Sequence, residues 1–318
     1  MKKWMTGLLS ITALVLVGCG TSAPKEEGQV TVGVLQLVEH ASLDAAYEGF
    51  KEGLAENGYE EGKNLTLTYQ NAQANQDNLK SMSEKLVSEK PELLLGIATQ
   101  AAQSLLNETQ TIPITVTAVT DLVTPKLVKS NEKPGGNVTG TTDMVPIEKQ
   151  ISLLLSIVPQ AKTVGIAYNA GEPNSKIQAE LAEKALKKAG ITTKVLTANT
   201  TNDVQQVMTS LAKDVDAIYI PTDNTFASAA AIVGDVAKAQ KVPVVAGSTA
   251  QVEEGGLATY GIDYHALGKQ TGKMAATILD GEKPATMPVE EATALELVVN
   301  KDMAQALGID PNSIVAPE

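Results

Sequence analysis

Apolar runs of strand length alternate with segments of helical periodicity from residue 30 onward. Nearly continuous apolar runs predict strands at 30–37, 64–70, 92–98 and 113–119. Helical spacing between them predicts helices near 43–57, 75–90 and 100–108. Apolar strands separated by helices indicate parallel βαβ units that are covered on both faces.

The same alternation starts again in the second half of the chain. Strands are predicted at 162–168, 192–198, 215–220, 242–246, 257–262 and 294–299, with helices near 174–189, 202–213, 225–240, 264–280 and 301–307. Val32-Gly33-Val34 matches Val164-Gly165-Ile166, and Gly58 matches Gly190, both at an offset of 132 residues. The constant offset favours an internal duplication over two unrelated domains of one type.

The predicted fold class is α/β, with two doubly wound, Rossmann-like lobes joined by a hinge of several crossing segments. Crossovers are expected at 137–146, at 260–265 and at 282–293. Lobe one is expected to comprise residues 30–142 plus about 264–284, and lobe two residues 143–262 plus about 290–318. Interleaved lobes of this kind suit a clamp that closes on a ligand.

The N-terminus has the pattern of an exported lipoprotein. Two lysines precede an apolar run that ends in Leu16-Val17-Gly18-Cys19, which predicts a signal peptide at 1–18 and a lipid on the thiol of Cys19. Residues 19–29 are then expected to form a flexible tether. The alternative is an ordinary secretory signal in which Cys19 has no role.

Composition narrows the functional classes. The formal net charge of -12 argues against a basic surface for nucleic acid, and all 25 basic residues are lysines. Without arginine, an anionic ligand has to be held by lysine, hydroxyl groups or backbone N–H groups. One cysteine and two histidines exclude a disulfide scaffold and a cysteine-rich metal site, and no phosphate-loop or nucleophile-elbow motif is present. We expect no cofactor; an enzyme that uses a pair of carboxylates stays as an alternative.

Ligands of doubly wound folds bind beyond the carboxyl ends of the strands. The predicted strand ends carry hydroxyl, amide, acidic and aromatic side chains. The candidate ligand-binding residues are Gln36, Glu39, His40, Ser42, Thr99, Gln100, Thr120, Asp121, Tyr168, Asn169, Glu172, Asn174, Asp223, Asn224, Tyr260 and Asp263. Several of them precede predicted helices, so an N-cap role is an equally good explanation for each one alone.

A ligand carboxylate is expected at the N-terminus of the helix near 100–108, with Thr99, Gln100 and Thr120 as additional donors. A ligand ammonium needs an acid, and the candidates are Asp223, Asp263 and Glu39. Four of the few aromatic residues are expected on the same side and favour an apolar or planar ligand side chain: Tyr168, Phe226, Tyr260 and Tyr264.

Short motifs at these strand ends carry a resemblance over about residues 30–310. They are the segments 34–40 (VLQLVEH), 97–103 (IATQAAQ), 117–121 (TAVTD), 137–140 (NVTG), 221–224 (PTDN) and 261–264 (GIDY). In these motifs the chain resembles the substrate-binding lipoproteins of ABC transporters, and within them the tryptophan- and aromatic-amino-acid-binding family. The resemblance implies a type I periplasmic-binding-protein fold and delivery of a bound amino acid to a membrane permease and its ATPase.

We therefore expect a monomeric receptor without catalytic activity, anchored on the outer face of a bacterial membrane, that closes on an aromatic amino acid such as tryptophan, phenylalanine or tyrosine. The same fold with a sugar, a nucleobase or a branched-chain amino acid is the first alternative. A lipoprotein whose ligand serves sensing rather than uptake is another.

Overall fold

A computed structural model describes residues 28–293 and 295–317. The expected signal peptide, Cys19 and nearly all of the tether lie outside these residues. Every described helix and strand lies between Val30 and Ser313. No helix among the described residues is long and apolar enough to cross a membrane.

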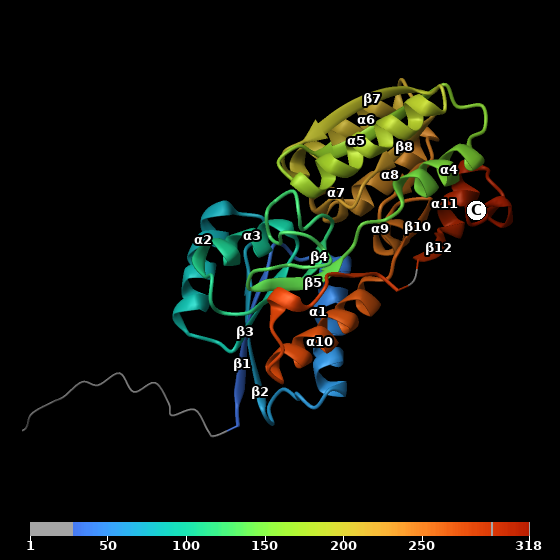
Figure 1. Ribbon diagram of the computed structural model, residues 1–318. Helices are drawn as coiled ribbons and strands as arrows, with labels where there is room; N and C mark the ends of the chain where they lie inside the picture. Colours follow the sequence, from blue (N-terminus) through green and yellow to red (C-terminus); the bar gives the residue numbers. More distant parts are fainter. Residues whose placement is uncertain (1–27, 294, 318) are drawn as a thin grey trace, which may run out of the picture.

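The chain forms two six-stranded sheets, each belonging to one lobe (Figure 1). The first sheet has the order β11-β5-β4-β3-β1-β2. Its strands are β1 (Val30–Gln36), β2 (Leu65–Asn71), β3 (Leu93–Ile97), β4 (Ile114–Val119), β5 (Val138–Thr142) and β11 (Glu290–Glu291). Its helices are α1 (Ala41–Glu56), α2 (Gln76–Ser88), α3 (Thr99–Glu108) and α10 (Tyr264–Leu279), with a 3₁₀ turn at Pro284–Thr286. All residues of β3 and β4 are buried, although two threonines interrupt the apolar run of β4.

The second sheet repeats this order as β12-β10-β9-β8-β6-β7. Its strands are β6 (Thr163–Asn169), β7 (Thr192–Ala198), β8 (Ala217–Ile220), β9 (Val244–Ala246), β10 (Ala258–Ile262) and β12 (Leu295–Val299). Its helices are α4 (Ile147–Ile157), α5 (Pro173–Lys188), α6 (Thr201–Ala212), α7 (Asn224–Ala227), α8 (Ala230–Gln240), α9 (Thr249–Glu254) and α11 (Lys301–Leu307), followed by a 3₁₀ turn at Pro311–Ser313. The predicted fold class is confirmed.

The two lobes match in register as well as in strand order. Adding 132 to the bounds of α1 gives the bounds of α5, residues 173–188. Gly58 and Gly190 follow these helices with φ of +91° and +77°, a left-handed conformation that glycine adopts without strain. The lobes differ at their last strand, because β11 is parallel to β5 whereas β12 is antiparallel to β10.

Three segments connect the lobes. The chain crosses between β5 and α4, then between β10 and α10, and finally between β11 and β12. The last crossing corrects the expected boundary. We placed the return to lobe two at about residue 290, but Glu290 and Glu291 pair with Thr141 and Thr142 in the first sheet. Two acidic residues at a sheet edge give no apolar signal, so the pattern predicted a crossover at 282–293 and no strand.

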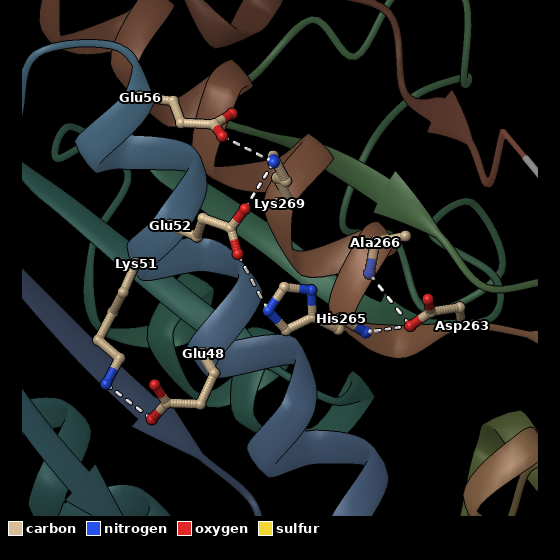
Figure 2. Close-up of polar contacts among 8 residues, drawn as sticks. All are labelled: Glu48, Lys51, Glu52, Glu56, Asp263, His265, Ala266 and Lys269. Carbon is tan, nitrogen blue, oxygen red and sulfur yellow. Dashed lines mark hydrogen bonds and ion pairs between the residues drawn. The ribbon is translucent and has the colours of Figure 1, made fainter.

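Helices α1 and α10 lie against each other on one face of the first sheet (Figure 1). Gly49 and Gly53 of α1 face Gly268 and Gly272 of α10, and each helix comes so close that a Cβ would meet the partner's backbone at 1.9–2.4 Å. Lys269 of α10 adds exposed ion pairs to two glutamates of α1, with Nζ–Oε1 distances of 2.6 Å and 2.8 Å (Figure 2). The glycines fix the spacing of the two helices, whose N-termini lie at the junction of the lobes.

Candidate ligand-binding site

Residues that follow strands of both sheets enclose a cavity between the lobes. In this closed arrangement it leaves about 20 Å³ of free space, enough for about one water molecule, so the lobes have to part to admit a larger ligand. Its lining residues are His40, Ser42, Leu43, Ala118, Asp143, Asn174, Thr222, Asp223, Asn224, Ala227, Ser248, Gln251 and Tyr264. A ligand in this cavity touches both lobes.

Among the described residues, four hydrogen bonds join the lobes directly across the cleft. They are His40 Nε2–Asn224 Oδ1 at 3.1 Å, Ser42 Oγ–Ser248 Oγ at 3.3 Å, Gln100 Nε2 to the Gly171 carbonyl at 3.1 Å, and Gln178 Nε2 to Thr120 Oγ1 at 3.0 Å. Each bond joins side chains or backbone that an opening of the cleft would separate. The structure therefore has its lobes closed on the cavity.

Asp143 is the buried acid that lobe one contributes to the cavity. It is 3% exposed and follows β5 in the first crossover. Its Oδ1 accepts a hydrogen bond from Thr120 Oγ1 at 2.7 Å, and its Oδ2 accepts one from the Tyr264 hydroxyl at 2.6 Å. Burial raises the pKa of Asp143 more than these two donors lower it. Both donors are neutral, so the carboxylate lacks a cationic partner among the described residues.

Lobe two contributes a pair of buried acids beside the cavity. Asp223 accepts backbone N–H bonds from Asn169 at 2.6 Å and from Phe226 at 2.9 Å. Burial and then the charge of Glu172 raise the pKa of Asp223 to about 8. Glu172 in turn accepts hydrogen bonds from the backbone and side chains of Asn224 and Thr225 and from Asn174 Nδ2. The lining of the cavity contains no lysine, so a cation inside it would be stabilised by both lobes.

The start of α1 supplies hydrogen-bond donors and a partial positive charge, in contrast to the buried acids. The first N–H groups of any helix have no partner within the helix, and α1 has no side-chain N-cap bond. Ser42, in its first turn, is 3% exposed and lines the cavity. An anion bound here would meet backbone N–H groups, a hydroxyl group and the positive end of the helix dipole.

Backbone strain occurs at the ends of β3 and β4. Ala98 and Ala118 have φ of 77° and 55°, which is unfavourable for residues with a Cβ. Ala118 lies where the pairing of β4 with β5 shifts register, between Val116 and Val119, and it lines the cavity. Strained residues of this kind concentrate at binding sites, where the surrounding structure holds them.

The expected site residues divide into four groups. Five line the closed cavity: His40, Ser42, Asn174, Asp223 and Asn224. Four line an adjoining cavity of about 650 Å³ between the lobes: Glu39, Gln100, Asn169 and Glu172. Asp263 lines a smaller cavity of about 280 Å³ that Ser42 and Tyr264 share, and its Oδ1 caps α10 (Figure 2).

The other six expected residues line none of these cavities: Gln36, Thr99, Thr120, Asp121, Tyr168 and Tyr260. Thr120 lies one step behind the site, since its hydroxyl accepts from Gln178 and donates to Asp143. Asp121 closes a turn by accepting from two backbone N–H groups. The expected group of Thr99, Gln100 and Thr120 thus does not meet at the closed cavity.

The expected cluster of four rings is not formed. Of these residues only Tyr264 lines the closed cavity, and Phe226 is 1% exposed within the core of the second lobe. Tyr260 points elsewhere: the ammonium of Lys149 lies 5.9 Å from its ring centroid. Successive side chains of a strand point to opposite faces, so a ring near a strand end faces the cavity only in the right register.

Sequence reasoning missed Asp143, Ala118, Ala227 and Gln251. Asp143 lies within the expected crossover 137–146, where no strand was predicted, so the rule on carboxyl ends of strands was not applied to it. The others carry no chemical signal. Only the packing of the two lobes brings them to the cavity.

The comparisons with known proteins bear on this site. The family of ABC transporter substrate-binding proteins matches residues 31–316. The chain belongs to this family. A tyrosine-binding protein of Clostridioides difficile is 39% identical over 313 residues, covering 95% of this chain and 90% of that protein.

Solved structures of similar sequence share the whole fold. A Streptococcus pneumoniae ABC domain in complex with L-Trp is 41% identical, with a TM-score of 0.86 and coverage of 89% of this chain and 96% of the other. The ligand-free, open structure of a Clostridium difficile substrate-binding protein is 42% identical, with a TM-score of 0.69 and coverage of 88% and 95%. Because identity and coverage are nearly equal, the lower score indicates a different arrangement of the lobes, in agreement with the interlobe hydrogen bonds described above.

Proposed function

We propose that this substrate-binding protein captures an aromatic α-amino acid in the cavity between its lobes and presents it, unaltered, to an ABC permease. The observation that carries the proposal is a closed interlobe cavity with buried acids from both lobes, no lysine, and an uncapped helix start. A zwitterion matches this polarity, because its ammonium and carboxylate lie on neighbouring atoms. The names of two similar proteins, with tyrosine and L-Trp as ligands, support the aromatic class.

Each part of such a ligand has a suitable partner. Asp143 and Asp223 accept from the ammonium, and Ser42 with the first N–H groups of α1 donates to the carboxylate. Apolar surface for the ring is supplied by four residues of the same cavity lining, Leu43, Ala118, Ala227 and Tyr264. This assignment moves the carboxylate from the expected group around Thr99 to the start of α1.

The test uses a chain that begins at residue 20 and so contains every described helix and strand. L-tryptophan, L-tyrosine and L-phenylalanine are compared with L-leucine, ribose and adenine by thermal shift. A ligand at about 100 times its Kd should stabilise the protein by roughly 2.7 kcal/mol. The proposal is overturned if none of the three aromatic amino acids raises the Tm. Recovery of chemically unchanged ligand after incubation is the expected result for a receptor, and a product would contradict it.

A matched pair of variants tests the role of the buried acid. Asp143→Asn should weaken the binding of every amino acid by about 10- to 100-fold, because the ammonium loses a charged partner. Asp121→Asn is the control, since Asp121 uses one oxygen in a turn and lines none of these cavities. Equal affinities of the two variants would remove Asp143 from the binding site.

We further propose that a lipid on Cys19 tethers a monomeric receptor to the outer face of the cell membrane. The motif Leu16-Val17-Gly18-Cys19 supports this proposal. In cells, wild type should fractionate with membranes and Cys19→Ala should not. Equal membrane fractions of the two would contradict the anchor, and a dimer in sedimentation of the chain from residue 20 would contradict the monomer.

A further inference from the structure

His40 occupies an unusual position at the closed cavity. It precedes α1 and lines the cavity, yet its side chain makes no cap bond to the helix. Its Nε2 lies 3.1 Å from Asn224 Oδ1 on the opposite lobe. Its Nδ1 is buried and has no hydrogen-bond partner among the described residues. Buried polar atoms are normally paired, so an unpartnered nitrogen at a ligand cavity needs an explanation.

The surrounding hydrogen bonds determine which ring nitrogen carries the proton. Glu172 Oε2 receives both the backbone N–H of Asn224 at 3.0 Å and its Nδ2 at 2.5 Å. A carboxylate only accepts, so the amide nitrogen of Asn224 faces Glu172 and the amide oxygen faces His40. That oxygen is an acceptor as well, and Nε2 of His40 must therefore be the protonated nitrogen.

The other nitrogen is then a free lone pair. A neutral imidazole carries one N–H, so Nδ1 can only accept. Burial lowers the pKa of His40 more than its bond to Asn224 and the charge of Glu172 raise it, which keeps the ring neutral.

We propose that Nδ1 of His40 accepts a hydrogen bond from the ammonium of the bound ligand, with Asn224 and Glu172 as positioning residues that fix the tautomer. This inference rests on the proposed function, since it needs an amino acid in the cavity. An ammonium has three N–H donors, and the cavity offers three such acceptors in Asp143, Asp223 and His40. The Asn224 bond forms only between closed lobes, so closure fixes the tautomer in which Nδ1 carries no proton and can accept a hydrogen bond.

A spectroscopic test is simple because the chain has only two histidines, His40 and His265. His265 is exposed, its ring bonded to Glu52 at 3.2 Å (Figure 2), and His265→Gln leaves one imidazole to observe. Long-range ¹H–¹⁵N correlation on the chain from residue 20, saturated with L-tryptophan or L-tyrosine, should show the Nε2–H tautomer. The Nδ1 resonance should move upfield on binding, as it does when this nitrogen accepts a hydrogen bond.

The outcomes separate the inference from the proposed function. Binding by calorimetry with an Nδ1–H tautomer, or with an unmoved Nδ1 resonance, overturns the role of His40 and leaves the proposed function standing. Failure of every aromatic amino acid to bind overturns both.

Substitutions of His40 distinguish a role as hydrogen-bond acceptor for the ligand from a role that only ties the two lobes together. The amide oxygen of Asn can take the place of Nδ1, whereas the amide of Gln reaches the place of Nε2. His40→Asn should therefore keep affinity within about fivefold, while His40→Gln and His40→Leu should lose about 10- to 100-fold. If His40 only tied the lobes together through Asn224, the order of Asn and Gln would be reversed. Asn224→Leu should retain a folded protein in which both tautomers of His40 appear; a single Nε2–H form there would remove Asn224 as a positioning residue.

Discussion

Replacing Gly268 by alanine should loosen the junction between α1 and α10. A Cβ at this position would lie 1.9 Å from the carbonyl oxygen of Ala46 and 2.7 Å from its carbonyl carbon. Ordinary van der Waals contact begins at 3.4 Å. Both atoms belong to the backbone of α1, so no side-chain rotation can relieve the clash, and one helix has to move away from the other.

The cost follows from two opposing effects. Overpacking a core costs about 1–3 kcal/mol, and the upper end applies here because only backbone can yield. Alanine in a helix interior returns about 1 kcal/mol relative to glycine. The net loss is therefore about 2 kcal/mol, which corresponds to a fall in Tm of roughly 4–8 °C for a lobe of this size.

Thermal unfolding by circular dichroism on the chain from residue 20 measures this loss. Gly136→Ala is the control, since Gly136 is exposed and a Cβ there meets nothing within 4 Å. Ser42 and Tyr264 stand at the starts of the two helices, so affinity for an amino acid should fall as well. The reasoning about helix spacing is refuted if Gly268→Ala melts together with the control.

Three further results are expected. Gln178→Leu should lower the free energy of unfolding by about 1–3 kcal/mol and weaken closure, because the buried amide donates to Thr120 Oγ1 at 3.0 Å and accepts from the Thr222 N–H at 3.2 Å; unchanged urea unfolding and ligand affinity would contradict this. Burial lowers the pKa of His40 from its ordinary 6.5, so only the unfolded chain takes up a proton just below pH 6.5. Wild type should therefore lose stability relative to His40→Gln as the pH falls from about 6.5 to 5, and a difference independent of pH would refute the burial argument. Lys269→Gln removes exposed ion pairs and should change the Tm little, with the difference vanishing at about 1 M salt; a large effect that survives salt would show that the pairs are not solvent-screened.

Several local features followed from the sequence because they depend on neighbouring residues alone. The strand β3 is an unbroken apolar run, β4 alternates apolar residues with two buried threonines, and α5 repeats α1 at an offset of 132 residues. Asp223 and Asp263 accept N–H bonds as N-caps of the helices that follow them, which was the plain alternative for these positions. The rule on carboxyl ends of strands also brought His40 and Asn224 into the candidate site.

The site itself required the tertiary structure. His40 and Asn224 are 184 residues apart, and their contact exists only because two lobes close on each other. Asp143 gained its role from the hydroxyl of Tyr264, which arrives through a different crossover. Tyr168 and Tyr260 stand at strand ends yet miss the cavity, because the register and twist of a strand decide where a ring points.

The sequence by itself determined the type of fold, the duplication and the polarity of the strand ends, since apolar periodicity and caps act over a few residues. Only the tertiary structure decided which polar groups meet, because interleaved crossovers and helix pairs fitted by glycine set distances between segments far apart in the chain. The buried acids and the free nitrogen of His40 face one cavity for that reason.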